Sequence, residues 1–218
     1  MMCSPTIILF LVFMAFPIAY VLYTSTLDWN GIEGALEAPF VGLNKYQRLV
    51  QDGFWWLAVR NTLLYAGIKI VFELPPALLL AVVLNSGIRG VVAYRTIGFI
   101  PVITSIAVVS LAFPYFFSPL PGAPFNEWMV QLGILDRPIA FLGERETAFW
   151  TVTGIAVWHD LGINMVFFLA ALQTVPKDLY EAATIDGANA RQRFLHIDVP
   201  AIRPLTAVIV TLSLAGSL

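Results

Sequence analysis

Long apolar runs alternate with shorter polar segments along the chain. Residues 5–24 form an uncharged run of about the 20 residues that a membrane-spanning helix requires. Comparable runs follow at 61–84, 96–117 and 148–172, and a shorter one occupies 205–218. This pattern predicts an all-α fold, a polytopic transmembrane helical bundle with five spans visible, the last incomplete.

Prolines mark where the predicted spans bend. Pro75 and Pro76 are expected to bend the second span, and Pro101 and Pro114 to break the third. The first run also resembles a secretory signal, but it is longer than a signal core and lacks both a preceding basic residue and a clear cleavage site. We therefore predict that it is a retained span.

The composition supports a membrane protein and excludes several other classes. Apolar residues make up 59% of the chain and charged residues 12%, against roughly 45–50% and 25% in soluble domains. Residues 1–218 are thus predicted to form a single transmembrane domain. The net charge of −2 does not favour binding to nucleic acid. Cys3 is the only cysteine, so no disulfide or cysteine metal site is expected. No phosphate-binding P-loop occurs, so the chain has no recognisable means of binding ATP itself.

The longest polar segment, residues 174–204, is predicted to fold as two short helices. Pro176 suits the first turn of a helix, and Gly187 suits the left-handed residue that ends one. Asn189 is placed to cap a second short helix that Pro200 closes. An ordinary amphipathic loop and a helix lying on the membrane surface are alternatives, although the acidic residues here argue against binding anionic lipid.

This segment resembles the "EAA" loop of bacterial ABC-transporter permeases, which docks on a cytoplasmic ATPase subunit. The resemblance implies that residues 174–204 are a cytoplasmic helix-turn-helix coupling loop. The residues that carry it, besides Ile197, are Glu181, Ala182, Ala183, Asp186, Gly187, Ala188 and Pro200.

From Phe40 onward almost the whole chain is similar to the sugar-type permeases, with the GLNKY loop at 42–46 and the QRF segment at 192–194 typical of the maltose or glycerol-phosphate type. Asp198-Val199 departs from the threonine-leucine usual before the proline. The resemblance implies a non-enzymatic transport subunit of a binding-protein-dependent ABC importer for a sugar or sugar derivative. It would need no cofactor of its own, because a partner binds ATP.

The same resemblance implies partners and a location. A second permease, two cytoplasmic ATPase subunits and an extracytoplasmic solute-binding protein would assemble with this chain in the plasma (inner) membrane of a bacterium or archaeon. Family members continue beyond the fifth span, so the chain is expected to be truncated at its C-terminus.

The distribution of basic residues predicts the orientation. The segments 85–95 and 173–204 carry two and four basic residues, whereas the alternate loops carry two each. Cytoplasmic loops are enriched in Lys and Arg, so the coupling-like segment is placed in the cytoplasm.

Lys69 and Glu73 lie inside the second predicted span, four residues apart on one helix face. Charged groups at membrane depth are costly and suggest function. One interpretation is a structural pair that faces other helices, and the other is contact with a polar solute. Both are kept, and the two residues are candidates for a translocation path.

A second candidate group lies in the fourth span. Asp160, Asn164 and Phe168 share one helix face, and a carboxylate, an amide and an aromatic ring together suit a sugar. Hydrogen bonding between helices is the alternative. His159 falls on another face, and with His196 it shows no metal-ligand spacing. We found no catalytic motif.

Two other functions compete with an ABC permease. An ion-coupled secondary transporter would use Glu73 or Asp160 as its coupling carboxylate, and its broken helices would mark the site. A membrane scaffold without transport activity is the third class. Uptake that requires ATP indicates an ABC permease, whereas uptake that requires only an ion gradient indicates a secondary transporter.

Overall fold

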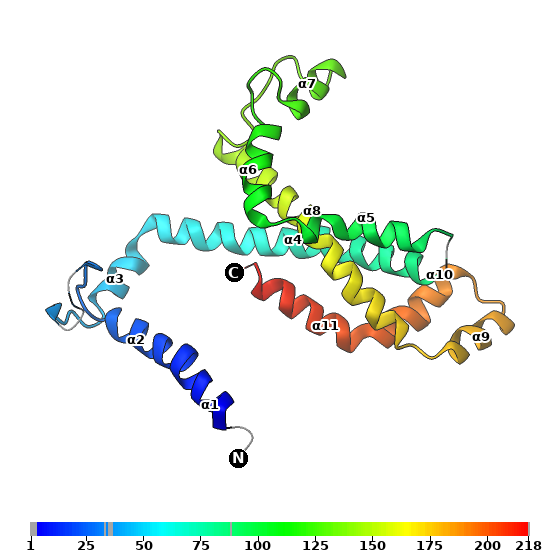
Figure 1. Cartoon of the computed structure of the whole chain (residues 1–218), viewed down its shortest axis with the longest axis horizontal. Coiled ribbons are helices and arrows are strands. Elements are labelled where there is room, and N and C mark those ends of the chain that lie inside the picture. The colour runs from blue at the N-terminus through cyan, green and yellow to red at the C-terminus, as the bar shows by residue number, and fades with distance from the viewer. Residues whose placement is uncertain (1–3, 33, 35–36, 88, 218) are drawn as a thin grey trace. The chain divides into compact units, whose positions relative to one another are not determined.

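Helices account for nearly all of the regular structure in the computed structural model (Figure 1), which describes residues 4–32, 34, 37–87 and 89–217. No β-strand occurs among these residues, apart from an isolated antiparallel bridge between Leu27 and Phe40. The predicted all-α fold is therefore confirmed. The chain divides into two units, Met1–Asn61 and Thr62–Leu218. Cys3 lies outside the described residues.

The first unit contains the first span and a small polar subdomain. α1 (Ser4–Phe10), a π-helical turn η1 (Leu11–Ala15) and α2 (Phe16–Thr24) follow one another without a gap, and Thr6–Thr24 is apolar and long enough to cross a membrane. None of its residues is buried within the chain, which suits a helix facing lipid or another subunit. α3 (Asn44–Gln51) is held to the end of α2 by a 2.6 Å hydrogen bond between the hydroxyls of Ser25 and Tyr46.

The second span, α4 (Gly53–Asn85), is longer than the predicted 61–84. It begins in the first unit and continues through the second. Its start is explained by Asp52, whose side chain accepts a 2.8 Å hydrogen bond from the backbone N–H of Phe54, as an N-cap residue does. Pro75 and Pro76 lie inside α4 without ending it.

The third span is broken, but not at its prolines. α5 (Val91–Ile103) and α6 (Ile106–Phe116) meet at 90° across Thr104 and Ser105, while Pro101 and Pro114 lie inside the two helices. Thr104 is extended, and the Ser105 hydroxyl accepts a 3.3 Å hydrogen bond from the backbone N–H of Ala107. A cap that starts a new helix thus fixes the break, and the prediction of breaks at the prolines was wrong in position.

The loop predicted at 118–147 contains a short helix, α7 (Pro124–Gln131), and is organised by one buried amide. Asn126 donates hydrogen bonds to the carbonyls of Ser118 at 2.7 Å and Ile139 at 3.0 Å, and accepts one from the N–H of Ile139 at 3.0 Å. α8 (Arg145–Gln173) then forms the fourth span and agrees closely with the predicted 148–172.

The polar segment folds as predicted at its start and differently at its end. α9 (Lys177–Ile185) ends before Gly187, whose φ of +73° is the expected left-handed conformation. Asn189 then caps α10 (Ala190–Arg193) by a capping box with Gln192.

Pro200 does not close the second helix, so that prediction was wrong. α10 runs through a π-helical turn, η3 (Phe194–Asp198), into α11 (Val199–Ala215), and Ala190–Ala215 is long enough to be one span. Pro200 is tolerated because it lies in the first turn of α11, directly after the wider π-helical turn. The last span therefore begins before the predicted residue 205, and its predicted end at 218 lies outside the described residues.

The core of the second unit lies where α4, α8 and α11 meet. α8 packs against α5 and α11. The buried side chains of this core include Leu74, Ala77 and Ala81 from α4, Met165, Phe168 and Leu172 from α8, and Ile202 and Ile209 from α11.

Candidate functional site

Four polar side chains form one largely buried network between α4 and α8. The ammonium group of Lys69 lies 2.6 Å from the Oδ2 atom of Asp160 and 3.8 Å from the Oε2 atom of Glu73. Asn164 donates a short hydrogen bond from its Nδ2 atom to the Oε1 atom of Glu73. The side chains of Lys69 and Glu73 are 4% and 0% exposed. Lys69 and Glu73 of the first predicted group and Asp160 and Asn164 of the second therefore form one network, which does not include Phe168.

Matching helical spacing explains how the network forms. Lys69 and Glu73 are one turn apart on α4, and Asp160 and Asn164 are one turn apart on α8. Each helix presents its pair to the other. Removing one partner from such a pair is costly, because an uncompensated charge then stays buried.

His159 connects the network to the break in the third span. Its Nδ1 atom lies 2.6 Å from the Oδ1 atom of Asp160, and its Nε2 atom lies 3.4 Å from the carbonyl oxygen of Thr104. Sequence analysis assigned His159 no role, because this residue falls on a different helix face from Asp160. Its partner is a backbone carbonyl at a helix break, which the residue pattern alone does not reveal.

A cavity of about 520 Å³ opens beside this network. Its wall is mostly apolar, with a few polar groups that could hold the hydroxyls of a small polar molecule and an aromatic ring for its C–H face. Its lining includes Tyr65 and Lys69 from α4, Ser110 and Phe113 from α6, and His159 and Asp160 from α8.

The candidate path residues differ in their access to this cavity. The Asp160 side chain is 32% exposed and lines it together with Lys69. Asn164 is 5% and Phe168 is 1% exposed, and Phe168 belongs to the core between the helices. Glu73 is likewise buried and reaches the cavity only through Lys69. In this chain, Asp160 and Lys69 are thus the two predicted path residues that face the open space.

The coupling-like segment presents an open surface. α9 contains no buried residue, and Glu181 and Ala182 are exposed, with Ala183 half-buried. Asp186 is the C-cap residue of α9, and Ala188 donates its N–H to the carbonyl of Ala183 at 2.8 Å. A small and accessible helix face of this kind allows close approach by another protein.

A hydrogen bond that the sequence did not predict joins this segment to the last span. The Tyr180 hydroxyl donates to the Oδ1 atom of Asp198 at 2.5 Å, and Asp198 is 6% exposed. Burial, and then the bond to Asp198, raise the pKa of Tyr180 above its usual value.

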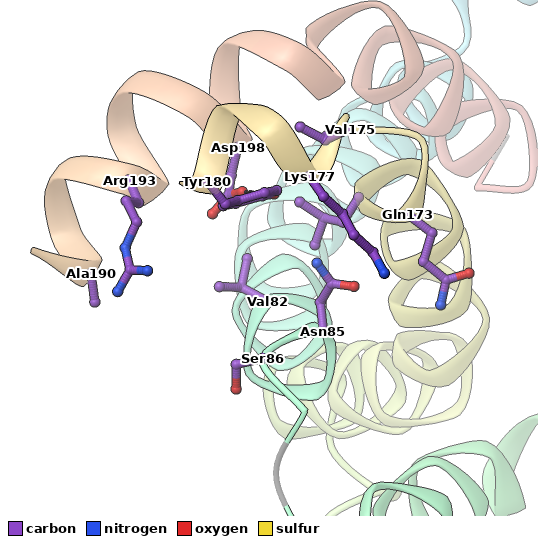
Figure 2. A pocket seen from close by; sticks show the side chains of 11 residues that line it. Val82, Asn85, Ser86, Gln173, Val175, Lys177, Tyr180, Ala190, Arg193 and Asp198 are labelled. Carbon is purple, nitrogen blue, oxygen red and sulfur yellow. Dashed lines mark hydrogen bonds between the residues drawn. The ribbon is translucent and has the colours of Figure 1, made fainter. Parts of the chain in front are cut away.

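Figure 2 shows Tyr180 and Asp198 at the wall of a second cavity of about 510 Å³. The ends of α4 and α8, with Asn85 and Gln173, line it together with Lys177 and Arg193. Within the described part of the chain, no group of three or more His, Cys, Asp or Glu side chains is placed to hold a metal ion.

In the part of the chain that the structure describes, four helices are long and apolar enough to cross a membrane, and a bent helix pair adds a broken fifth span. Together with a mostly apolar cavity beside buried charges and an exposed helix-turn-helix segment, these helices define a multi-pass membrane protein of the transporter class. Residues 1–218 match the family described as "Binding-protein-dependent transport system inner membrane component". The chain belongs to this family of ABC-transporter permeases.

Individual relatives agree. The chain is 32% identical to the probable ABC transporter permease protein YurN of Bacillus subtilis, over 96% of this chain and 72% of the relative. It is 37% identical to the arabinooligosaccharides transport system permease protein AraP of the same organism, over 98% of this chain and 66% of the relative. The chain thus spans about two thirds of the length of these two relatives.

A solved structure shows the same fold. The match is to a chain of a bacterial ABC transporter involved in the import of the acidic polysaccharide alginate, with a TM-score of 0.85 and 27% sequence identity. It covers 100% of this chain and 72% of the other.

Proposed function

We propose that this chain is a permease subunit of a binding-protein-dependent ABC importer and carries a sugar or oligosaccharide across the membrane. The observation that carries the proposal is the fold match along the whole chain to an alginate importer. Relatives named for arabinooligosaccharide and lactose transport, which are 37% and 32% identical, support the class of solute.

In this proposal the cavity beside the charge network is part of the translocation path. Asp160 and Tyr65 offer hydrogen-bonding groups to hydroxyls of the solute, and Phe113 offers a ring. Lys69 neutralises Asp160 and so limits the cost of holding a carboxylate at membrane depth.

The coupling segment would dock on an ATPase subunit. Its open face at Glu181, Ala182 and Ala183 supports this role, and the excess of basic residues supports a cytoplasmic location. A second permease, two ATPase subunits and an extracytoplasmic binding protein would complete the importer. A related solved structure contains an alginate-bound periplasmic protein, which supports the last partner.

Uptake into vesicles tests the proposal. Right-side-out vesicles that contain the assembled importer should take up labelled oligosaccharide only with internal ATP and added binding protein. A complex whose ATPase subunit cannot hydrolyse ATP is the control. Uptake driven by a proton or sodium gradient without ATP would instead establish an ion-coupled transporter.

Removal of the Tyr65 hydroxyl tests whether the cavity is part of the translocation path. Tyr65→Phe should raise the apparent KM for uptake about two- to tenfold, the range expected for one hydrogen bond, and leave assembly unchanged. Tyr94→Phe is the matched control, because it removes the same atom from an exposed position on α5. Equal KM values for both variants would remove Tyr65 from the path.

A further inference from the structure

α9 is attached to the rest of the protein by few side-chain interactions. It buries no residue, and within residues 174–204, all of which the structure describes, one side-chain hydrogen bond joins α9 to another element. That bond runs from Tyr180 to Asp198. Tyr180 is also the residue of α9 that packs against the core.

The space between α9 and the ends of α4 and α8 is partly open. The cavity of about 510 Å³ lies between the α9–α10 segment and the ends of these two helices (Figure 2). The segment therefore does not rest directly on Asn85 and Ser86 across that space. α9 is joined to α8 by the backbone at 174–176, and to the last span by the glycine turn and by the side chain of Tyr180.

The bond closes a loop around the glycine turn. Tyr180 and Asp198 are 18 residues apart, and Gly187 with its φ of +73° lies between them. The backbone N–H groups of Gly187 and Ala188 bond back to the carbonyls of Thr184 and Ala183, which closes the end of α9 but does not join it to the helix that follows. A glycine permits several backbone conformations, so the angle between the two helices depends on contacts beyond the turn. Asp198 ends the π-helical turn η3, and such turns occur often at functional sites.

We propose that Tyr180 is a positioning residue for energy coupling, which makes α9 and the beginning of the last span move as one body. The inference rests on the proposed function, and it adds a specific route for the transmitted motion. Without the bond, α9 pivots at Gly187 and the ATPase moves it without moving the last span. A tyrosine hydroxyl is protonated across the physiological pH range, so Tyr180 can donate to Asp198 throughout it.

Two measurements on the reconstituted importer test this inference. In Tyr180→Phe, amide hydrogen exchange in residues 177–185 should accelerate about tenfold, as expected for loss of a hydrogen bond to a charged group. The ATPase should still co-purify, but the amount of solute transported per ATP hydrolysed should fall severalfold. Asp198→Asn keeps an oxygen that can accept the hydrogen bond from Tyr180. In this variant the rise in exchange and the fall in transport per ATP should both be smaller than in Tyr180→Phe.

Tyr94→Phe is the control for removal of a tyrosine hydroxyl. Unchanged exchange in Tyr180→Phe would overturn the link itself, whether or not the vesicles transport solute. Faster exchange with an unchanged transport-to-hydrolysis ratio would overturn the coupling role. If the wild-type importer showed no ATP-dependent uptake, the proposed function would fail, and the exchange measurement would still decide whether Tyr180 holds α9.

Discussion

Replacing Gly162 by alanine should separate two helices of the second unit. α5 and α8 approach so closely that a Cβ atom on Gly162 would lie 2.2 Å from the carbonyl oxygen of Gly98 and 2.9 Å from the Cγ2 atom of Val102. The nearest atom belongs to the backbone of α5 and cannot rotate away. Small residues permit this type of close helix packing in membranes.

The cost follows from the distance. A carbon and a carbonyl oxygen require about 3.3 Å, so the two helices must move apart by about 1 Å. A gap of that size forfeits roughly a quarter to a half of the dispersion energy of each contact across it. Overpacking costs about 1–3 kcal/mol, and the rigid backbone contact places Gly162→Ala at the upper end, or about a hundredfold in the unfolding equilibrium.

Gly154→Ala provides a matched control on the same helix. Nothing lies within 4 Å of a Cβ atom built at Gly154, so alanine should be neutral there or stabilise the helix by about 0.5–1 kcal/mol. Denaturant titration of both purified variants in the same mild detergent measures the difference. If Gly162→Ala were as stable as Gly154→Ala, the close approach of α5 and α8 would be incorrect.

Three further predictions concern the charge network, the glycine turn and the topology. Glu73→Gln should lower the yield of folded protein, because Lys69 loses part of its neutralisation at membrane depth. Normal uptake by the double variant Lys69→Met with Glu73→Met would show that the charged pair can be replaced. Gly187→Val should weaken co-purification of the ATPase, since a side chain at φ +73° costs about 1 kcal/mol or more, whereas intact co-purification would show that the turn does not position the docking surface. A cysteine at Asn189 should react only with cytoplasmic reagents and one at Gly122 only with external reagents, and the reverse pattern would refute the orientation.

Periodicity and length were sufficient to predict the spans but not their ends. Apolar runs identified α4 and α8, yet α4 begins earlier because Asp52 caps it. Helix breaks were assigned to Pro101, but the bend lies at Thr104 and Ser105, where a side-chain cap competes with the ladder of backbone hydrogen bonds. Pro101 and Pro114 lie inside the two helices, so proline did not indicate where the third span breaks.

The site was predicted in parts. Spacing along each helix grouped Lys69 with Glu73, and Asp160 with Asn164 and Phe168, although Phe168 lies in the hydrophobic core and not in the charge network. It could not show that the two groups meet, because they are 91 residues apart and their contact depends on how α4 packs against α8. Tyr180 was missed for the same reason, since its partner Asp198 drew notice only as a departure from the family pattern.

The charge network also indicates which wall of the cavity should move during transport. Separating α4 from α8 would lengthen the 2.6 Å contact of Lys69 with Asp160 and leave charges uncompensated at membrane depth, so these helices should move together. α6 lies beyond the 90° bend and buries only Val109 among its residues, so we expect the cavity to open there. Spin labels at exposed Leu111 and Trp150 should change their separation when the assembled importer binds ATP, and labels at exposed Val71 and Val166 should not. A larger change in the second pair would mean that the network opens during transport and does not clamp α4 to α8.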